Sequence, residues 1–199
     1  MTQIHEHALG LTWVMDDAMQ RASHALVDDL GRVWLVDPVD DPEAMERVAA
    51  LGEPAGVIQL LDRHNRDCAA VAPRLGVPHF KVPAALPEAP FTPQRVVQNR
   101  LWQEVALWWP ARRALVVAEA LGTAPAFAVG SGPVGVHPVL RLRPPHQLKQ
   151  LAAEHLLVGH GPPVHGPETA DAIAEAIDHS WRDTPRLLLK LPSLILANR

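Results

Sequence analysis

The segment DRHNRD, residues 62–67, places two aspartates, two arginines and one histidine directly after an apolar run. Imidazole nitrogens and carboxylate oxygens are ligands for zinc, manganese and iron, and histidine also exchanges protons near neutral pH. The chain has 11 histidines, which adds to the supply of such groups. The segment is therefore a candidate metal site or the remnant of one, and the elements around it must decide between these two interpretations.

The length and composition are those of one globular domain. The chain has 199 residues, of which 48% are hydrophobic and 20% charged, enough to bury a core. The net charge of −4 argues against nucleic-acid binding, and no apolar run approaches the roughly 20 residues that span a bilayer. The single cysteine, Cys68, excludes an internal disulfide, and the first residues lack the features of a signal peptide. We expect a soluble, cytoplasmic protein.

Strand and helix patterns alternate along the first half of the chain. Asp41 before Pro42 is typical of a helix start, and a helical apolar stripe containing Cys68 predicts a second helix that ends at Gly76. The predicted order is a hairpin of strands at 24–29 and 32–37, a helix at 41–52, a buried strand at 55–61, a helix at 67–76 and a strand at 77–82. This alternation is typical of an α/β protein.

The second half repeats the pattern. A Pro-rich surface loop is predicted at 82–94, and the segment from Gln98 to Trp102 is interpreted as a further loop. The remaining elements are an antiparallel pair of strands at 104–109 and 113–121, a glycine-containing loop at 124–145, a short helix at 146–154, a strand at 155–161 and an amphipathic helix at 167–181. We expect one domain over 1–199. Its apolar tail, at about 183–199, is predicted to be a closing helix, with a homodimer contact and a membrane-surface helix as alternatives.

Three segments carry a resemblance to a known family. In order they are the strand ending in DRHNRD, the hairpin strand ending in VVAEALG, and the strand ending in HLLVGHGPPV. This order resembles the metallo-β-lactamase-fold superfamily, which includes glyoxalase II-like hydrolases. The preceding VWLVDPVDDPEAMERVAALG is similar to that family's strand, Asp-Pro turn and helix. The resemblance covers roughly residues 10 to 180 and implies an α/β (α+β) fold, the four-layer αβ/βα sandwich of that family.

The individual residues depart from the family's metal motif. In the register that the resemblance implies, His64 and His160 match metal-binding histidines and Glu119 stands at the bridging aspartate. Asp62, Arg66 and Asp67 stand where the family has a histidine, an aspartate and a histidine. A further histidine of the family is missing, and Asn99 or Arg100 lies near its place. Because a guanidinium has no lone pair to donate, Arg66 argues against a two-metal centre and predicts an ion-pair network with nearby carboxylates.

Three hypotheses follow for the function. The one we favour is a divergent, non-catalytic or ligand-binding protein that has lost its two-metal centre, holds no cofactor and attracts an anionic small molecule to Arg66. The alternative is a hydrolase of an ester or thioester-like bond with one zinc, manganese or iron ion held by Asp62, His64, Glu119 and His160. In that case Asp67 would orient the attacking water. The third is a self-association module that uses the tail and exposed tryptophans. Whether the protein is an enzyme stays open at this point.

Other chemically active residues have simpler interpretations. Cys68 lies in an apolar stripe and is expected to be a packed core thiol. His5 and His7 lie in a segment expected to fray, and four scattered histidines, at 137, 146, 155 and 165, are expected at the surface or at caps. GSGPVG, residues 130–135, lacks the Lys-Ser/Thr of a phosphate-binding loop and is interpreted as a loop over the pocket.

Overall fold

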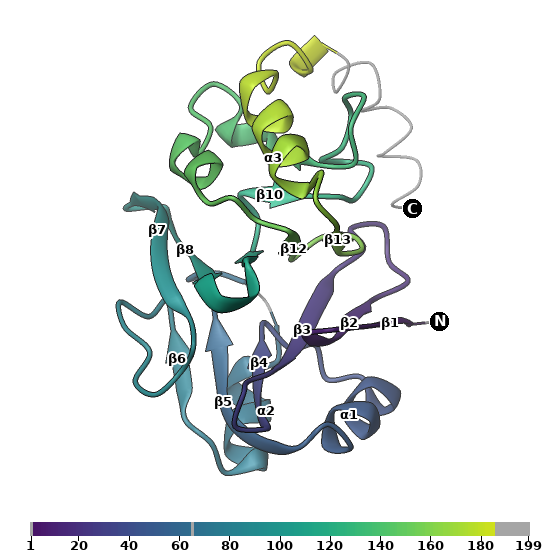
Figure 1. The fold of residues 1–199 in the computed structure, drawn as a ribbon, viewed down its shortest axis with the longest axis vertical. Coiled ribbons are helices and arrows are strands. Elements are labelled where there is room, and N and C mark those ends of the chain that lie inside the picture. The colour runs from purple at the N-terminus through teal and green to yellow at the C-terminus, as the bar shows by residue number, and fades with distance from the viewer. Residues whose placement is uncertain (1, 65, 186–199) are drawn as a thin grey trace.

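The fold is given by a computed structural model that describes residues 2–64 and 66–185 (Figure 1). Its strands are β1 (Gln3–His7), β2 (Gly10–Val14), β3 (Ala22–Val27), β4 (Arg32–Val36), β5 (Glu53–Gln59), β6 (His79–Lys81), β7 (Thr92–Asn99), β8 (Trp102–Trp109), β9 (Ala114–Val117), β10 (Leu121–Gly122), β11 (Gly135–Val136), β12 (His155–Val158) and β13 (Val164–His165). Its helices are α1 (Pro42–Ala49), α2 (Cys68–Leu75), α3 (Thr169–Asp178) and the short 3-10 helices η1 (Pro110–Arg112), η2 (Pro138–Leu140) and η3 (His146–Gln150).

Two larger sheets are formed by the strands of the described ranges. The first has the order β1-β2-β3-β4-β5-β6, and the second has the order β13-β12-β9-β8-β7. Each sheet combines antiparallel with parallel pairing: β4, β5 and β6 are parallel neighbours in the first sheet, and β9 and β12 are parallel neighbours in the second. A separate short ribbon pairs β10 with β11. The parallel pairs matter for the site, because the carboxyl ends of parallel neighbours deliver their next residues to the same edge of a sheet.

Three apolar clusters show the layering. Along β4, Val33 and Leu35 pack towards α1 and α2, while Trp34 and Val36 face the second sheet. On the second sheet, Val116 faces the first sheet, and its neighbours Leu115 and Val117 pack towards α3 and η3. Side chains that alternate between two faces in this way are expected of strands covered on both sides. The arrangement is α1 and α2, the first sheet, the second sheet, and α3, which is the predicted αβ/βα sandwich (Figure 1).

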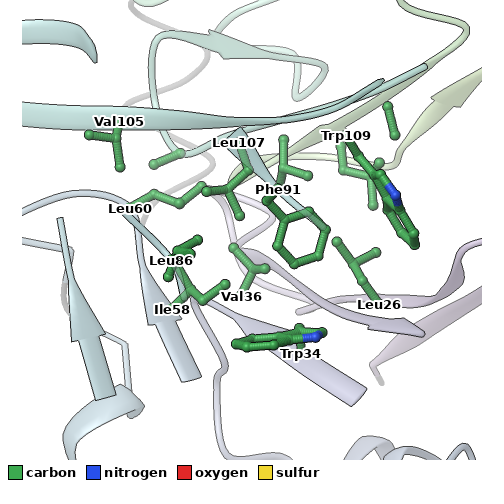
Figure 2. Packing of buried hydrophobic residues seen from close by; sticks show 14 of the residues in the cluster. Leu26, Trp34, Val36, Ile58, Leu60, Leu86, Phe91, Val105, Leu107 and Trp109 are labelled. Carbon is green, nitrogen blue, oxygen red and sulfur yellow. The ribbon is translucent and has the colours of Figure 1, made fainter. Parts of the chain in front are cut away.

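The core between the sheets is rich in aromatic residues (Figure 2). Phe91 packs edge-on against both Trp34 and Trp109, with ring centroids 6.1 and 5.2 Å apart. Leu60 and Leu107 reach the same space from the two sheets. Burying side chains of this size contributes roughly 2–3 kcal/mol each before the entropic cost of ordering them, so this layer fixes how the sheets lie against each other.

The helix that begins after Asp41 is confirmed, since the Asp41 side chain accepts the Ala44 N–H and Pro42 is its first residue. α2 ends at Gly76 in the left-handed conformation, as its sequence predicts. Cys68 is a buried core thiol, and burial raises the pKa of its side chain, so it is not an activated nucleophile.

Five expectations about local structure were wrong. Residues 3–7 form the ordered edge strand β1, because their backbone pairs in register with β2. Gln98–Trp102 is a tight hairpin between β7 and β8, and β7 begins within the Pro-rich segment, at Thr92. The helix predicted at 146–154 is a 3-10 turn over 146–150, and the strand predicted at 113–121 ends at Val117.

The structure describes few residues of the predicted apolar tail: 183–185 are included, and 186–199 lie outside the described residues. Within the described part of the chain, no helix is long and apolar enough to cross a bilayer.

Candidate metal centre

The parallel strand pairs β4–β5 and β9–β12 bring four titratable residues to one edge of the sandwich. Asp37 directly follows β4, and His64 follows β5 after a short extension. In the second sheet Val117 pairs with Val158, so Glu119 and His160 leave β9 and β12 at matching positions. Isolated bridges from Arg21 to His160 and from Leu61 to Glu104 tie the two sheets together at this edge.

Three of the residues predicted as ligands converge. His64, Glu119 and His160 offer ligand atoms that all lie within 4.8 Å of one another. We call these three residues the triad. The imidazole rings of His64 and His160 are 6.0 Å apart, and both side chains are buried. Glu119 is more accessible, with 23% of its side chain exposed, so the triad opens to solvent on the Glu119 side.

His64 is held by Asp37. The Nδ1 atom of His64 lies 3.0 Å from Asp37 Oδ2, a close contact rather than an aligned hydrogen bond, and both side chains are 3% exposed. Asp37 is itself fixed, since its Oδ1 accepts the Leu60 N–H and its carbonyl accepts the Ser23 hydroxyl. Asp37 adopts a φ of +45°, a left-handed conformation that aspartate tolerates better than most residues. A carboxylate at one nitrogen is the usual means of orienting a metal-binding histidine.

His160 is oriented from the other sheet. Its Nδ1 lies 2.9 Å from the Met19 carbonyl oxygen, and because a carbonyl only accepts, Nδ1 carries the proton. The Nε2 atom is therefore unprotonated in the neutral ring. It faces Glu119 Oε1 at 3.7 Å and has no hydrogen-bond partner among the described residues. Phe127 stacks on the ring at 5.3 Å between centroids.

Glu119 lies between two histidines. Its Oε2 is 3.7 Å from His137 Nε2, as its Oε1 is from His160. Burial by itself raises the pKa of the Glu119 carboxyl, but His160, His64 and His137 outweigh this effect and hold its pKa below the usual value. The carboxylate form therefore persists at neutral pH, as a metal ligand requires.

Glu104 holds the backbone that carries Glu119. Its Oε1 accepts the N–H groups of Glu119 and Ala120 at 2.9 Å, and its Oε2 accepts the Trp102 indole N–H. Glu104 is 1% exposed, and burial raises the pKa of its carboxyl to about 7 despite these three donors. It positions the loop and does not itself reach the triad ligand set.

The Gly-His-Gly motif has a steric reason. A Cβ at Gly159 would lie 2.3 Å from the Ala118 carbonyl oxygen and 3.1 Å from Cε1 of His64. Gly161 has a φ of +100°, and a Cβ there would lie 2.3 Å from the Thr123 hydroxyl. Both glycines are needed to bring His160 this close to its neighbours.

Arg66 lies beside the triad. Its Nη2 donates to the Gly159 carbonyl oxygen at 2.9 Å, while its Nε is buried without a hydrogen-bond partner among the described residues. Burial lowers the pKa of the guanidinium, and the charges of Asp37 and Glu119 act in the opposite direction. The side chain is a cation near these two acidic groups, but among the described residues its hydrogen bond goes to a backbone carbonyl and it forms no ion pair with a carboxylate. The ion-pair network predicted for Arg66 is therefore not formed within the described part of the chain.

The other predicted residues have different surroundings. Asp62 accepts the Gln103 N–H at 3.3 Å, and Asp67 accepts the Asp40 N–H at 2.8 Å. Asn99 accepts the Leu101 N–H within the β7–β8 turn, and Arg100 is exposed in that turn. The ligand and water-orienting roles predicted for Asp62 and Asp67 stay predictions.

The sequence did not single out Asp37, Glu104 or His137 as parts of the site. For Asp37 a signal was present, because it begins the Asp-Pro turn after a strand whose parallel partner leads to DRHNRD. Glu104 lies inside an apolar strand, where a carboxylate needs partners. His137 lies in a loop whose path no local pattern predicts.

Comparison with solved structures places this geometry in a known fold. DIM-1 metallo-β-lactamase superposes with a TM-score of 0.58 at 12% identity, covering 92% of this chain and 97% of that one. TTHA1623 in a di-iron-bound form gives 0.56 at 15% identity, covering 82% and 96%. BLEG-1 B3 metallo-β-lactamase gives 0.56 at 14% identity, covering 92% and 100%. No family model and no curated protein matches the sequence.

The predicted resemblance is thereby confirmed for the fold: the chain has the metallo-β-lactamase fold. At 12–15% identity these similarities concern architecture, and the chemistry must be argued from the residues of this chain.

Proposed function

We propose that the protein binds one divalent metal ion through His64, Glu119 and His160 and hydrolyses an ester or thioester-like bond. The proposal replaces the two-metal centre suggested by the fold with a single-metal one. The observation that carries it is the convergence of these three ligands within 4.8 Å, two of them buried histidines. This is the single-metal hydrolase that the sequence analysis gave as the alternative hypothesis, with the ligand set reduced to three residues because Asp62 is omitted.

The residues present fit a metal ion. The Nε2 atoms of His64 and His160 are buried and lack hydrogen-bond partners within the described ranges, which is costly unless something else occupies them. Two histidines and one glutamate form a ligand set found in catalytic zinc sites, with a position left for water. A divalent ion held there would supply Lewis acidity and lower the pKa of water towards neutrality.

The residues of the chain have distinct roles in this proposal. Asp37 and the Met19 carbonyl oxygen orient the two imidazoles, and Glu104 fixes the backbone of Glu119. His137 accepts the Val139 N–H at Nδ1, so its neutral ring carries a proton at Nε2, beside Glu119. We assign His137 a positioning role, because its Nε2–H faces Glu119 and can donate a hydrogen bond to that carboxylate or to a substrate oxygen.

Arg66 supports a single ion rather than two. TTHA1623 shares the fold and is described in a di-iron-bound form. Here a guanidinium donates to the Gly159 carbonyl oxygen within the electrostatic range of Asp37 and Glu119, and its charge would repel a second cation. The same charge would attract a carboxylate or phosphate group of a substrate.

The first experiment is metal content by elemental mass spectrometry. Untagged protein is expressed with zinc, manganese and iron present and is purified without chelators. We expect about one equivalent in the wild type and its loss in His64→Ala/His160→Ala. The control His146→Ala/His179→Ala also removes two histidines, from other parts of the chain, and should retain the metal. Metal-loaded protein is then tested on ester and thioester panels.

A second candidate function rests on Arg66. Its Nε is buried and unpaired within the described residues, which favours the non-catalytic, anion-binding protein that the sequence suggested. In this case no metal would be bound, and phosphate or a carboxylic acid would raise the melting temperature of the wild type but not of Arg66→Gln. Metal at background level in the wild type, together with this anion effect, would replace the hydrolase proposal.

A further inference from the structure

Four histidines lie on β1, β12 and β13 at one edge of the sandwich, where the ring of His7 on β1 contacts that of His165 on β13. His5 and His7 come from β1, and His155 and His165 are direct cross-strand partners on β12 and β13. The His7 and His165 rings are 4.9 Å apart, and the His155 and His165 rings are 5.0 Å apart. We call these four residues the histidine edge. It lies outside the triad and contains residues that the sequence placed in frayed or surface positions.

Both ring nitrogens of His7 take part in a chain of hydrogen bonds that runs between the two sheets. The Leu9 N–H donates to His7 Nδ1, so His7 Nε2 carries the proton and donates to Thr12 Oγ1 at 3.1 Å. Thr12 lies 2.9 Å from His24 Nδ1, and His24 Nε2 lies 3.2 Å from the Val158 carbonyl oxygen, which only accepts. The chain therefore has one consistent direction, and both nitrogens of His7 and of His24 are used.

His155, His165 and His5 keep nitrogens available. The Nδ1 atoms of His155 and His165 are 2.9 Å apart, and Nε2 of His5 is buried without a hydrogen-bond partner among the described residues. Two neutral imidazole nitrogens at this separation either share one proton or share a cation. Ligand nitrogens on a tetrahedral zinc ion are about 3.3 Å apart at Zn–N distances near 2.05 Å. A change of a few tenths of an ångström converts the pair into two ligands.

We propose that His5, His155 and His165 form a second metal site, which binds zinc, copper(II) or nickel across the edge of the two sheets. Imidazole nitrogen suits these borderline cations, and the exposed position of His165 gives access from solvent.

Binding at the histidine edge would join β1 of the first sheet to β12 and β13 of the second. A cation that binds the folded protein and not the unfolded chain raises stability by RT ln(1 + [M]/Kd). Within the described residues only the triad has three ligand atoms already within 4.8 Å of one another. The nitrogens of the histidine edge must therefore move closer together to bind a metal ion. We therefore expect weaker binding at the edge than at the triad.

The test is calorimetric titration of the His64→Ala/His160→Ala variant with zinc alone, and with copper(II) followed by electron paramagnetic resonance. We expect one equivalent of either metal, nitrogen hyperfine structure from imidazoles, and a zinc-dependent rise in melting temperature. Adding His155→Ala/His165→Ala should abolish all three effects, while adding His146→Ala/His179→Ala should leave them unchanged. His5→Ala alone should weaken binding about tenfold if His5 is the third ligand.

No binding in the His64→Ala/His160→Ala variant, or binding retained after His155→Ala/His165→Ala, would overturn the site, and an unchanged affinity in His5→Ala would overturn the three-ligand set. If the His64→Ala/His160→Ala variant does not fold, the wild type gives the same test. Its stoichiometry should fall by one equivalent in His155→Ala/His165→Ala, and an unchanged stoichiometry would reject the proposal. The triad is intact in that comparison, so failure of the hydrolase proposal and failure of this one are distinguishable.

Discussion

The triad and the histidine edge both contain histidines, but the two groups differ in how the ring nitrogens are hydrogen-bonded. At the triad, His64 has Asp37 at one nitrogen and His160 has a carbonyl oxygen at one nitrogen, which leaves the other nitrogens unpaired and buried. At the edge, His7 uses both nitrogens in hydrogen bonds, while His155 and His165 contact each other. What distinguishes a ligand from a structural histidine is the partner of its second nitrogen.

The largest expected effect concerns His24, which links the two regions through the Val158 carbonyl oxygen. Burial is the main cause that lowers the pKa of His24 to about 3, against 6.5 for an exposed histidine. Between those values the unfolded chain binds a proton that the folded protein does not, so stability falls as pH decreases from 6.5 towards 3. The slope is about 1.4 kcal/mol per pH unit, or about 3 kcal/mol over two units.

His24→Phe should remove this slope, as measured by urea unfolding at pH 7.5, 6.5, 5.5 and 4.5. Glu104 acts in the opposite direction in both proteins, because its raised pKa of about 7 favours the folded state below that pH. The difference between the two proteins therefore isolates His24. A slope unchanged by His24→Phe would mean that His24 binds its proton equally well in the folded and unfolded states, which contradicts the hydrogen-bonded chain of neutral histidines.

The second prediction disrupts the triad without removing a ligand. In Gly159→Ala the new Cβ meets the Ala118 carbonyl oxygen and the ring of His64, so the strand ends must separate. We expect a loss of about 2–3 kcal/mol of stability and loss of triad metal, with binding at the histidine edge retained. Gly132→Ala is the matched control, since its Cβ would lie 3.7 Å from the nearest atom. Equal effects of the two changes would show that the close approach at Gly159 is not needed.

The third prediction removes the charge behind His64. Asn at position 37 keeps an oxygen for the Leu60 N–H and tolerates the positive φ, so Asp37→Asn should fold. Metal affinity at the triad should fall about 10–100-fold, the range typical of a lost outer-shell carboxylate, while the edge is unaffected. Asp29→Asn makes the same change on an exposed residue and serves as the control. An undiminished affinity would show that His64 needs no orienting partner.

Much of the fold was predictable from the sequence because its signals are local. Asp41 and Pro42 start α1, Gly76 ends α2, and the apolar runs give the inner strands. The errors occur where long-range pairing decides the outcome. The polar strand β1 is ordered by its register with β2, and β7 continues through Pro93 beside β8.

The site was predictable to the extent that each ligand follows a strand. The ends of β5, β9 and β12 carry His64, Glu119 and His160, and the resemblance of these three segments to the metallo-β-lactamase-fold family suggested them as ligands. The orienting groups were not predictable in the same way. The Met19 carbonyl oxygen carries no sequence signal, and Glu104 becomes meaningful only when its three N–H donors are seen around it. The histidine edge combines residues more than 150 positions apart, which no spacing rule can connect.

The fourth prediction concerns the cation beside the triad. Arg66→Asp replaces a repelling charge with a potential ligand, so metal affinity should rise on the order of tenfold, or about 1.4 kcal/mol, and a second equivalent can bind. Arg66→Gln should give a smaller increase. Arg63→Asp changes an exposed arginine over the Trp102 ring and is the control. Titration calorimetry measures both affinity and stoichiometry, and no change in either would contradict the role of Arg66 as the group that excludes a second ion.

The smallest effect is expected for Asp62→Asn. The geometry leaves Asp62 outside the group of converging ligand atoms, with one oxygen on the Gln103 N–H, and asparagine can keep that bond. Affinity at the triad should therefore stay within about twofold, well below the roughly 10–100-fold loss that is typical when a residue supporting a metal ligand is removed. A loss of that larger size would show that Asp62 turns towards the metal as a fourth ligand, as the position of DRHNRD first suggested. The metal site would then have four ligands rather than the three that converge, and it would differ more strongly from the three-ligand site at the histidine edge.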